Sequence, residues 1–383
     1  MTQKKDKVIN LHEPLFKGNE LKYLKDCIKS TWVSTNGKYI SKFENRISKF
    51  TKANHAIYCI NGTHALQMCL KVCGVSRDDE VIVPTLTFVA PINAVCYNNA
   101  NPIFMDSDNN YNIDQSKTIS FIKEKTVYRN GKTINRKTKK VIKAIIIVHV
   151  FGNAADISDL VNICKKRNIK IIEDASESLG TFYKHNKTHT GTIGDLGVIS
   201  FNGNKIITSG GGGMILTNSN KLNERIRYLI YQAKDDAFNY IHDEIGYNFA
   251  QTNISAAIGL AQIERIKIIL KKKKKIYQEY VKLFHKNKNA YVSKVPVISE
   301  NNYWLNLIRV NAKKKDYFIK KFISKKVNVR PIWYPNHLQK SFKACQTYKI
   351  KNALILHSES ICLPSSYHLA KSDLRRIVSV IND

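Results

Sequence analysis

A carboxylate and a lysine are the groups in this sequence whose types and spacing best suit catalysis. Asp174 ends an apolar stretch, and Lys205 follows 31 residues later, five residues before a run of four glycines. A lysine amine can form a Schiff base with an aldehyde, and a buried carboxylate can hold a proton on a pyridine nitrogen. Most lysines are simply solvated, but this pairing is what pyridoxal phosphate requires, and it predicts that cofactor.

Three further features could hold the phosphate and the ring of such a cofactor. Gly62, Thr63 and His64 follow an apolar, strand-like stretch and open a predicted helix. The free amide groups of a helix N-terminus favour a phosphate, although Thr63 fits equally well as an ordinary N-cap. Ser200 lies five residues before the lysine and could bond to the same phosphate. Phe88 could stack on a flat ring or belong to the core.

Strand-like and helix-like patterns alternate in the first part of the chain. The apolar run at 144–150 is typical of a strand buried on both faces. Alternation of this kind predicts a mostly parallel sheet flanked by helices, and ligands of such sheets collect at the carboxyl ends of strands. Asp174 and Ser200 are expected at such ends. Further strands are predicted at 80–84, 169–172, 197–201 and 213–217, and helices at 19–30, 63–72, 91–97 and 156–166.

The pattern changes after residue 220, and the chain is long enough for two domains. We therefore expect a large α/β domain at residues 1–250 and a smaller α+β domain at 251–383. The elements predicted in this later part are helices at 222–233, 316–324 and 372–381, a long or broken helical segment at 251–283, and strands at 303–310 and 327–331.

The net charge of +32 could indicate an anionic partner. Nucleic acid or an anionic surface is one explanation. A lysine-rich composition and a polyanionic substrate are others, and no nucleic-acid partner is expected. The insert at 127–140 concentrates basic residues from Arg129 onward and predicts an added hairpin. The run Lys271–Lys275 predicts the solvated face of a helix.

The eight cysteines are scattered without a Cys-x-x-Cys pair, so we expect reduced core residues and neither disulfides nor a metal site. No run of eighteen apolar residues is present, and no apolar segment follows the basic start of the chain. These features predict neither a membrane span nor a signal peptide. A cytoplasmic protein without a membrane partner is the expectation.

Ordered motifs along nearly the whole chain carry a resemblance to a known family. They include Trp32-Val-Ser-Thr-Asn-Gly37, Asn61-Gly-Thr-His-Ala-Leu66, Glu173-Asp-Ala-Ser-Glu-Ser-Leu-Gly180, the Lys205 segment, Gly246-Tyr-Asn-Phe-Ala-Gln-Thr-Asn253 and Tyr334-Pro-Asn-His-Leu338. The sequence resembles the DegT/DnrJ/EryC1/StrS sugar-nucleotide aminotransferases, which are pyridoxal-phosphate enzymes of fold type I. This resemblance implies a parallel central sheet with helices around it and a smaller C-terminal α+β domain.

The resemblance also implies a role for each matching residue. Lys205 would form the Schiff base and shuttle protons, and Asp174 would pair with the pyridinium nitrogen. Asn248 would reach the phosphate from a second subunit, so the enzyme would be a homodimer with shared sites. The other residues implied are Gly62, Thr63, the backbone of His64 and Ser200 at the phosphate, Phe88 over the ring, Glu177 near the phenolic oxygen, and Thr35, Tyr334 and His337 at the sugar.

The implied reaction is transamination at C4 of a nucleotide-linked 4-keto-6-deoxyhexose with glutamate as the amino donor. A UDP sugar is favoured, and the product would be viosamine, perosamine or an N-acetylated analogue for glycan synthesis. Glu177 replaces a Gln that many relatives have, and it would need a proton or a water beside the phenolic oxygen. The alternatives are amination at C3 and a non-catalytic homologue that binds the cofactor or nucleic acid. Lys205 argues against the dehydratases of the superfamily, in which His replaces the lysine.

Overall fold

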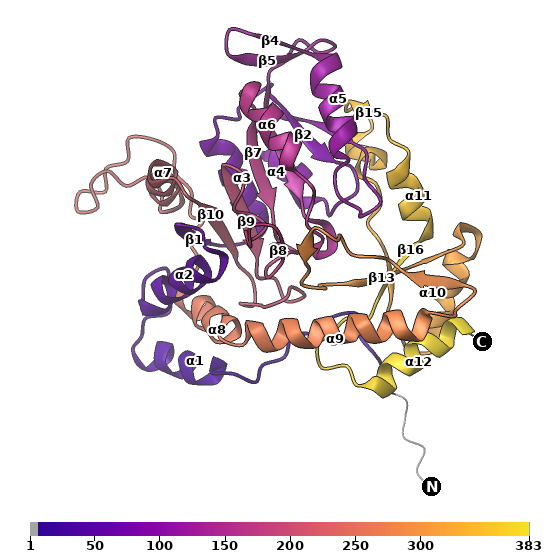
Figure 1. Cartoon of the computed structure of the whole chain (residues 1–383). Coiled ribbons are helices and arrows are strands. Elements are labelled where there is room, and N and C mark those ends of the chain that lie inside the picture. The colour runs from indigo at the N-terminus through magenta and orange to yellow at the C-terminus, as the bar shows by residue number, and fades with distance from the viewer. Residues whose placement is uncertain (1–6, 383) are drawn as a thin grey trace.

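The structure, a computed structural model, describes residues 7–382 and is built around an eight-stranded sheet (Figure 1). In sheet order, the strands are β1 (His55–Cys59), β10 (Gly213–Thr217), β9 (Leu196–Ser200), β7 (Lys170–Asp174), β6 (Ile142–Val148), β2 (Glu80–Pro84), β3 (Asn101–Met105) and β15 (Thr347–Tyr348). The six strands β9, β7, β6, β2, β3 and β15 are parallel to their neighbours in this order, whereas β10 is antiparallel to both β9 and β1. The predicted α/β class with a mostly parallel sheet is confirmed.

Strand β6 shows why helices cover both faces of this sheet. Ile145 and Ile147 belong to one buried cluster, and Ile146 and Val148 belong to another, because successive side chains of a strand alternate. The strand ends at Val148 and not at residue 150 as predicted, since the chain then forms a 3-10 turn. The flanking helices are α5 (Gln115–Lys125) and α6 (Ser158–Lys166) on the first face, and α3 (Gly62–Val72), α4 (Ala90–Tyr97) and α7 (Asn220–Ile230) on the second.

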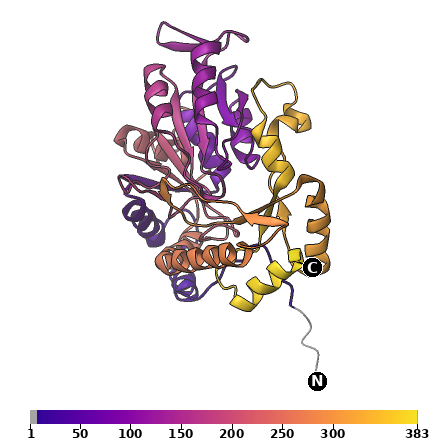
Figure 2. The ribbon, with the colours of Figure 1, turned by 45° about the vertical axis from the view of Figure 1, so that its right-hand side comes forward.

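A second sheet forms in the C-terminal part and has its own buried cluster. Its strands, all antiparallel to their neighbours, are β11 (Ala290–Val292), β13 (Asn306–Val310), β16 (Ser360–Leu363) and β14 (Arg330–Pro331). The nearby helices are α9 (Ile266–Phe284), α10 (Lys315–Ser324), α11 (Asn352–Glu359) and α12 (Lys371–Asn382). Figures 1 and 2 show α9 along the lower side of the molecule, beneath both sheets.

The long helical segment predicted at 251–283 is a broken pair. Helix α8 (Asn253–Ile263) is separated from α9 by Glu264 and Arg265. Helix α8 packs against α1 (Glu20–Lys29) and α2 (Lys38–Thr51). The predicted basic hairpin is confirmed as β4 (Thr126–Arg129) and β5 (Lys132–Asn135), at the top of Figure 1. The remaining short strands are β8 (Phe182–Tyr183) and β12 (Ser299–Glu300), which pair with each other.

All eight cysteines are free thiols. Six are buried, but Cys96 is exposed and Cys345 is half-buried. Cys96 lies near the end of α4, so the expectation of a core position was wrong there. Within residues 7–382, no helix has the length and apolar character needed to cross a bilayer. Ile9 forms a bridge with Val327, so the segment before α1 packs on the C-terminal part. The boundary between the two predicted domains at residue 250 stays a prediction.

Candidate active site

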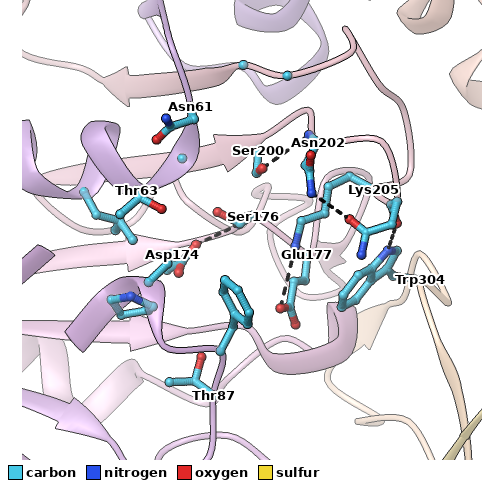
Figure 3. A pocket seen from close by; sticks show the side chains of 18 of the residues that line it. Asn61, Thr63, Thr87, Asp174, Ser176, Glu177, Ser200, Asn202, Lys205 and Trp304 are labelled. Carbon is cyan, nitrogen blue, oxygen red and sulfur yellow. Dashed lines mark hydrogen bonds and ion pairs between the residues drawn. The ribbon is translucent and has the colours of Figure 1, made fainter. Parts of the chain in front are cut away.

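A cavity of about 250 Å3 lies where strands β7 and β9 end (Figure 3). Parallel strands and the crossovers between them bring distant segments together at this edge of the sheet. Several sequence-predicted residues line the cavity: Gly62, Thr63, Phe88, Asp174, Glu177, Ser200 and Lys205.

The N-terminus of α3 forms one end of the cavity. Asn61 caps this helix, because its side chain accepts a hydrogen bond of 2.9 Å from the His64 amide. The amides of Gly62 and Thr63 lie in the first turn, where a helix has no carbonyl partners of its own. A Cβ at Gly62 would lie 3.2 Å from the Cβ of Ser200. Glycine therefore lets α3 approach the end of β9 closely, and amides and a hydroxyl gather as donors for an anion.

Asp174 is the last residue of β7, and its side chain is buried on the floor of the cavity. Its Oδ1 accepts a hydrogen bond of 3.0 Å from the Ser176 amide. Burial raises the pKa of Asp174, although the hydrogen bonds from Ser176 lower it. A carboxylate in this position is stabilised by a cationic donor inside the cavity, such as a protonated ring nitrogen.

The Lys205 amine points into the cavity between a carboxylate and an aromatic ring (Figure 3). Its Nζ lies 3.8 Å from Oε1 of Glu177 and 4.4 Å from the centre of the Trp304 ring. The other oxygen of Glu177 accepts a hydrogen bond of 2.7 Å from the Phe151 amide. Burial raises the pKa of Glu177 to about 7, while the lysine opposes this rise. At neutral pH, Glu177 is therefore present in both its neutral and its charged form.

The described groups fit pyridoxal phosphate. The N-terminus of α3 and Ser200 offer donors for a phosphate, the buried Asp174 suits a protonated ring nitrogen, and Lys205 supplies an amine on the same cavity. Phe88, although 54% exposed on the protein surface, also lines the cavity and offers a flat apolar surface. Hydrogen-bond donors, a carboxylate and an amine thus line one cavity, and these are the groups that the phosphate, the ring nitrogen and the aldehyde of that molecule require.

Two predicted residues next to the cofactor site do not line this cavity. The His64 ring lies 3.0 Å from the Asn61 side chain and 4.4 Å, between centroids, from the ring of Phe249; the prediction for His64 concerned its backbone. Asn248 is exposed and forms a bridge with Tyr231 outside the cavity. Its predicted role depends on a second subunit, so it stays a prediction.

The three predicted sugar-binding residues also lie outside the cavity. Thr35 is half-buried in the loop before α2. Tyr334 packs edge-on against His357. His337 has its Nδ1 2.6 Å from the hydroxyl of Thr85 and is held there. The structure does not bring these three side chains to the Lys205 amine, and their roles stay predictions.

Sequence reasoning missed several lining residues. Asn202 and Asn204 stand in the same segment as the lysine, and Ser176 follows Asp174, so their positions beside named residues were the available signal. Trp304 and Trp333 had no such signal, because tertiary packing alone brings them from the C-terminal part to the cavity. The two indole rings stack with centroids 6.4 Å apart.

Comparisons with known proteins identify the family of this chain. The chain belongs to the DegT/DnrJ/EryC1/StrS aminotransferase family, which matches residues 14–382. It is 37% identical to a GDP-perosamine synthase of Escherichia coli O157:H7, over 98% of each chain. It is 31% identical to the putative pyridoxal phosphate-dependent aminotransferase EpsN of Bacillus subtilis, over 98% of this chain and 95% of that one.

The fold is also that of a solved aminotransferase. Helicobacter pylori PseC, which takes part in the biosynthesis of pseudoaminic acid, superposes with a TM-score of 0.88 at 22% identity over 98% of both chains. The chain is thus a pyridoxal-phosphate-dependent sugar-nucleotide aminotransferase. The predicted family, enzyme class and cofactor are confirmed.

Proposed function

We propose that this enzyme transfers the amino group of glutamate to C4 of a GDP-linked 4-keto-6-deoxyhexose and so forms GDP-perosamine. Three relatives that are 32–37% identical carry the name GDP-perosamine synthase. Two of them match over 98% of this chain. The preference for UDP stated from the sequence is therefore replaced by GDP.

Amination at C3 is the second candidate. A relative from Aneurinibacillus thermoaerophilus, 27% identical over 93% of this chain, carries the name dTDP-3-amino-3,6-dideoxy-alpha-D-galactopyranose transaminase. Its lower identity makes C3 amination and a dTDP sugar the weaker proposal.

One observation carries the proposed chemistry: Asp174 and Lys205, from separate segments, line the same cavity as the N-terminus of α3. When bound, pyridoxal phosphate accepts an amino group and withdraws electrons from the carbon that bears it. Gly62, Thr63 and Ser200 would bind its phosphate. Asp174 would hold a proton on the ring nitrogen and so maintain the electron-withdrawing power of the ring.

The Lys205 amine would move the proton of the reacting carbon. A general base must lie within reach of that proton and must be neutral for part of the cycle. Glu177, 3.8 Å away, can be protonated near neutral pH because burial raises its pKa to about 7. Protonated Glu177 would donate a hydrogen bond to the phenolic oxygen of the cofactor, where an ionised carboxylate would repel that oxygen.

We also propose a cytoplasmic homodimer in which Asn248 of each subunit completes the phosphate site of the other. Support comes from its exposure in a segment that also exposes large apolar side chains. Phe238 is 89% exposed, and Ile245 is 87% exposed. Such a surface is typical of one that a partner covers.

A substrate panel tests the proposed reaction. The purified enzyme, loaded with the cofactor and glutamate, is given 4-keto-6-deoxyhexoses linked to GDP, UDP or dTDP, and the products are analysed by mass spectrometry and NMR. We expect amination of the GDP sugar at C4 with the highest kcat/KM. Preferred amination of a UDP or dTDP sugar, or an amine at C3, would contradict the proposal.

A further inference from the structure

One lysine of the run Lys271–Lys275 is buried, although the run predicted a solvated helix face. The side chain of Lys273 is 1% exposed, whereas Lys271, Lys274 and Lys275 are exposed and Lys272 is half-buried. The run spans more than one turn of α9, so one of its side chains points inward. The solvated-face prediction was therefore wrong at residue 273.

The buried amine of Lys273 is held by two backbone carbonyls. Its Nζ donates hydrogen bonds of 2.7 Å to the Trp304 carbonyl and 2.6 Å to the Ser365 carbonyl. Among residues 7–382, no carboxylate forms an ion pair with it. Burying a cation without a counter-charge is costly, and burial lowers the pKa of Lys273. The amine satisfies two buried carbonyls that an apolar residue would leave without a donor.

Trp304 connects this buried amine to the cavity. Lys273 fixes the Trp304 backbone, and the Trp304 indole Nε1 donates a hydrogen bond of 2.7 Å to the carbonyl of Asn204, the residue before Lys205. The face of the same ring lies 4.4 Å from Nζ of Lys205. Lys273 thus binds the backbone of Trp304, and the indole of Trp304 contacts both the segment and the amine of Lys205.

A second observation places the two lysines close together. Lys205 and Lys273 both line a small internal cavity of about 10 Å3, together with His12 and Tyr367. Lys205 also lines the larger cavity described above. Lys273 therefore lies close to the Lys205 segment as well as to the Trp304 backbone.

We propose that Lys273 is a positioning residue, whose buried amine fixes Trp304 so that the indole holds the Lys205 amine in its working place. The proposal rests on the proposed role of Lys205 and adds a residue that does not touch the substrate or the cofactor. Misplacement of a catalytic group by about 1 Å can reduce turnover on the order of 100-fold. Loss of the Lys273 amine is expected to act through kcat, because the groups proposed to bind substrate and phosphate remain.

The structure offers a matched control on the same helix. Tyr280 is also buried in α9 and donates a hydrogen bond of 2.8 Å to the Pro364 carbonyl, next to Ser365, but it has no hydrogen bond to Trp304. Tyr280→Phe removes a comparable buried hydrogen bond, and Lys274→Met removes an exposed lysine. We would compare Lys273→Met with both variants by thermal unfolding, kcat, KM, and the absorbance and induced circular dichroism of the bound cofactor.

Lys273→Met should reduce kcat by about 10- to 100-fold, leave KM for the sugar nucleotide within about threefold, and change the induced circular dichroism of the cofactor. Tyr280→Phe should lower Tm and leave kcat and that spectrum unchanged, and Lys274→Met should change none of them. If Lys273→Met resembles Tyr280→Phe in kcat and spectrum, its role is only structural and the proposal is overturned.

Trp304→Phe keeps the test decisive if Lys273→Met does not fold. It removes the bond from the indole to Asn204 and should change the same spectrum and kcat; unchanged values would overturn the proposal by themselves. Where both variants fold, the double variant should show non-additive losses in kcat, and additive losses would overturn it too. Lys205→Ala distinguishes failure of the proposed function from failure of the inference about Lys273. An active Lys205→Ala enzyme would contradict the proposed function itself.

Discussion

Glu173 and Asp174 are consecutive residues of β7, but their carboxylates contact different parts of the protein. Glu173 is fully buried and lies 2.9 Å from Nε2 of His149. It also accepts hydrogen bonds of 2.6–2.9 Å from three backbone amides of the loop Gly191–Gly194. Asp174 instead lines the cavity. Alternation along the strand thus separates a carboxylate that holds a loop from one that is available to a cofactor.

Glu173→Gln and Asp174→Asn are expected to affect different properties. Glu173→Gln leaves buried amides facing an NH2 group, so the free energy of unfolding should fall by about 2–4 kcal/mol. Asp174→Asn should change that free energy by less than about 1 kcal/mol, because burial of this charge is unfavourable without the cofactor, but turnover should fall at least about 100-fold. Urea titrations of the cofactor-free proteins and steady-state kinetics measure the two effects. A fully active Asp174→Asn enzyme would remove the assigned role of the carboxylate.

Lys205→Ala is expected to abolish transamination while the fold is retained. The amine is the group proposed to move the proton, and such groups contribute about 100- to 10,000-fold to rate. The visible absorbance of the bound cofactor should also be lost, because no amine remains at that place. The exposed Lys221 at the start of α7 provides a control, since Lys221→Ala should retain normal kinetics. Normal turnover of Lys205→Ala would refute the site as assigned.

Glu177→Gln should change how stability depends on pH. Burial raises the pKa of Glu177 from its ordinary 4.5 to about 7, so the folded protein binds this proton more tightly than the unfolded chain does. The stabilising contribution is therefore complete below pH 4.5 and is lost as the pH rises through 7. Neutral Gln should remove about 1–3 kcal/mol of that decline. Urea titrations of both proteins at about pH 4 and pH 8 would show it; equal declines would mean that folding leaves the pKa of Glu177 at its ordinary value.

Asn248→Ala should weaken cofactor binding without dissociating the dimer. A hydrogen bond to a charged phosphate contributes about 1.5–3 kcal/mol, so the Kd of the cofactor should rise at least about tenfold. Equilibrium dialysis measures this Kd, and analytical ultracentrifugation gives the oligomeric state. A dimeric variant with unaltered affinity would show that Asn248 does not reach the phosphate.

The sequence carried enough information for the sheet and for much of the cavity. The apolar run of β6 and the ends of β7 and β9 are local patterns, and a parallel sheet necessarily gathers strand ends at one edge. Asp174 and Ser200 could be placed there without a structure. The antiparallel course of β10 was not predicted, because its apolar pattern is the same for either direction.

The C-terminal contribution to the site could not be predicted in the same way. Trp304 and Trp333 reach the cavity through tertiary packing, and their local sequence looks like that of any core aromatic residue. The placement of His337 had a similar cause, since its contact with Thr85 depends on how the C-terminal part docks. The burial of Lys273 depends on the rotation of α9, which a run of identical residues does not specify.

The burial of Lys273 also has a consequence for chemical labelling. An acylating reagent, such as an N-hydroxysuccinimide ester, reacts with an amine that it can reach, and three of the five consecutive lysines in α9 are exposed. Peptide mass mapping of the labelled native enzyme should therefore show acyl groups on both sides of residue 273 and none on it. Denaturation before labelling should make all five amines equivalent, which turns this short segment into an internal reporter of whether α9 is in place.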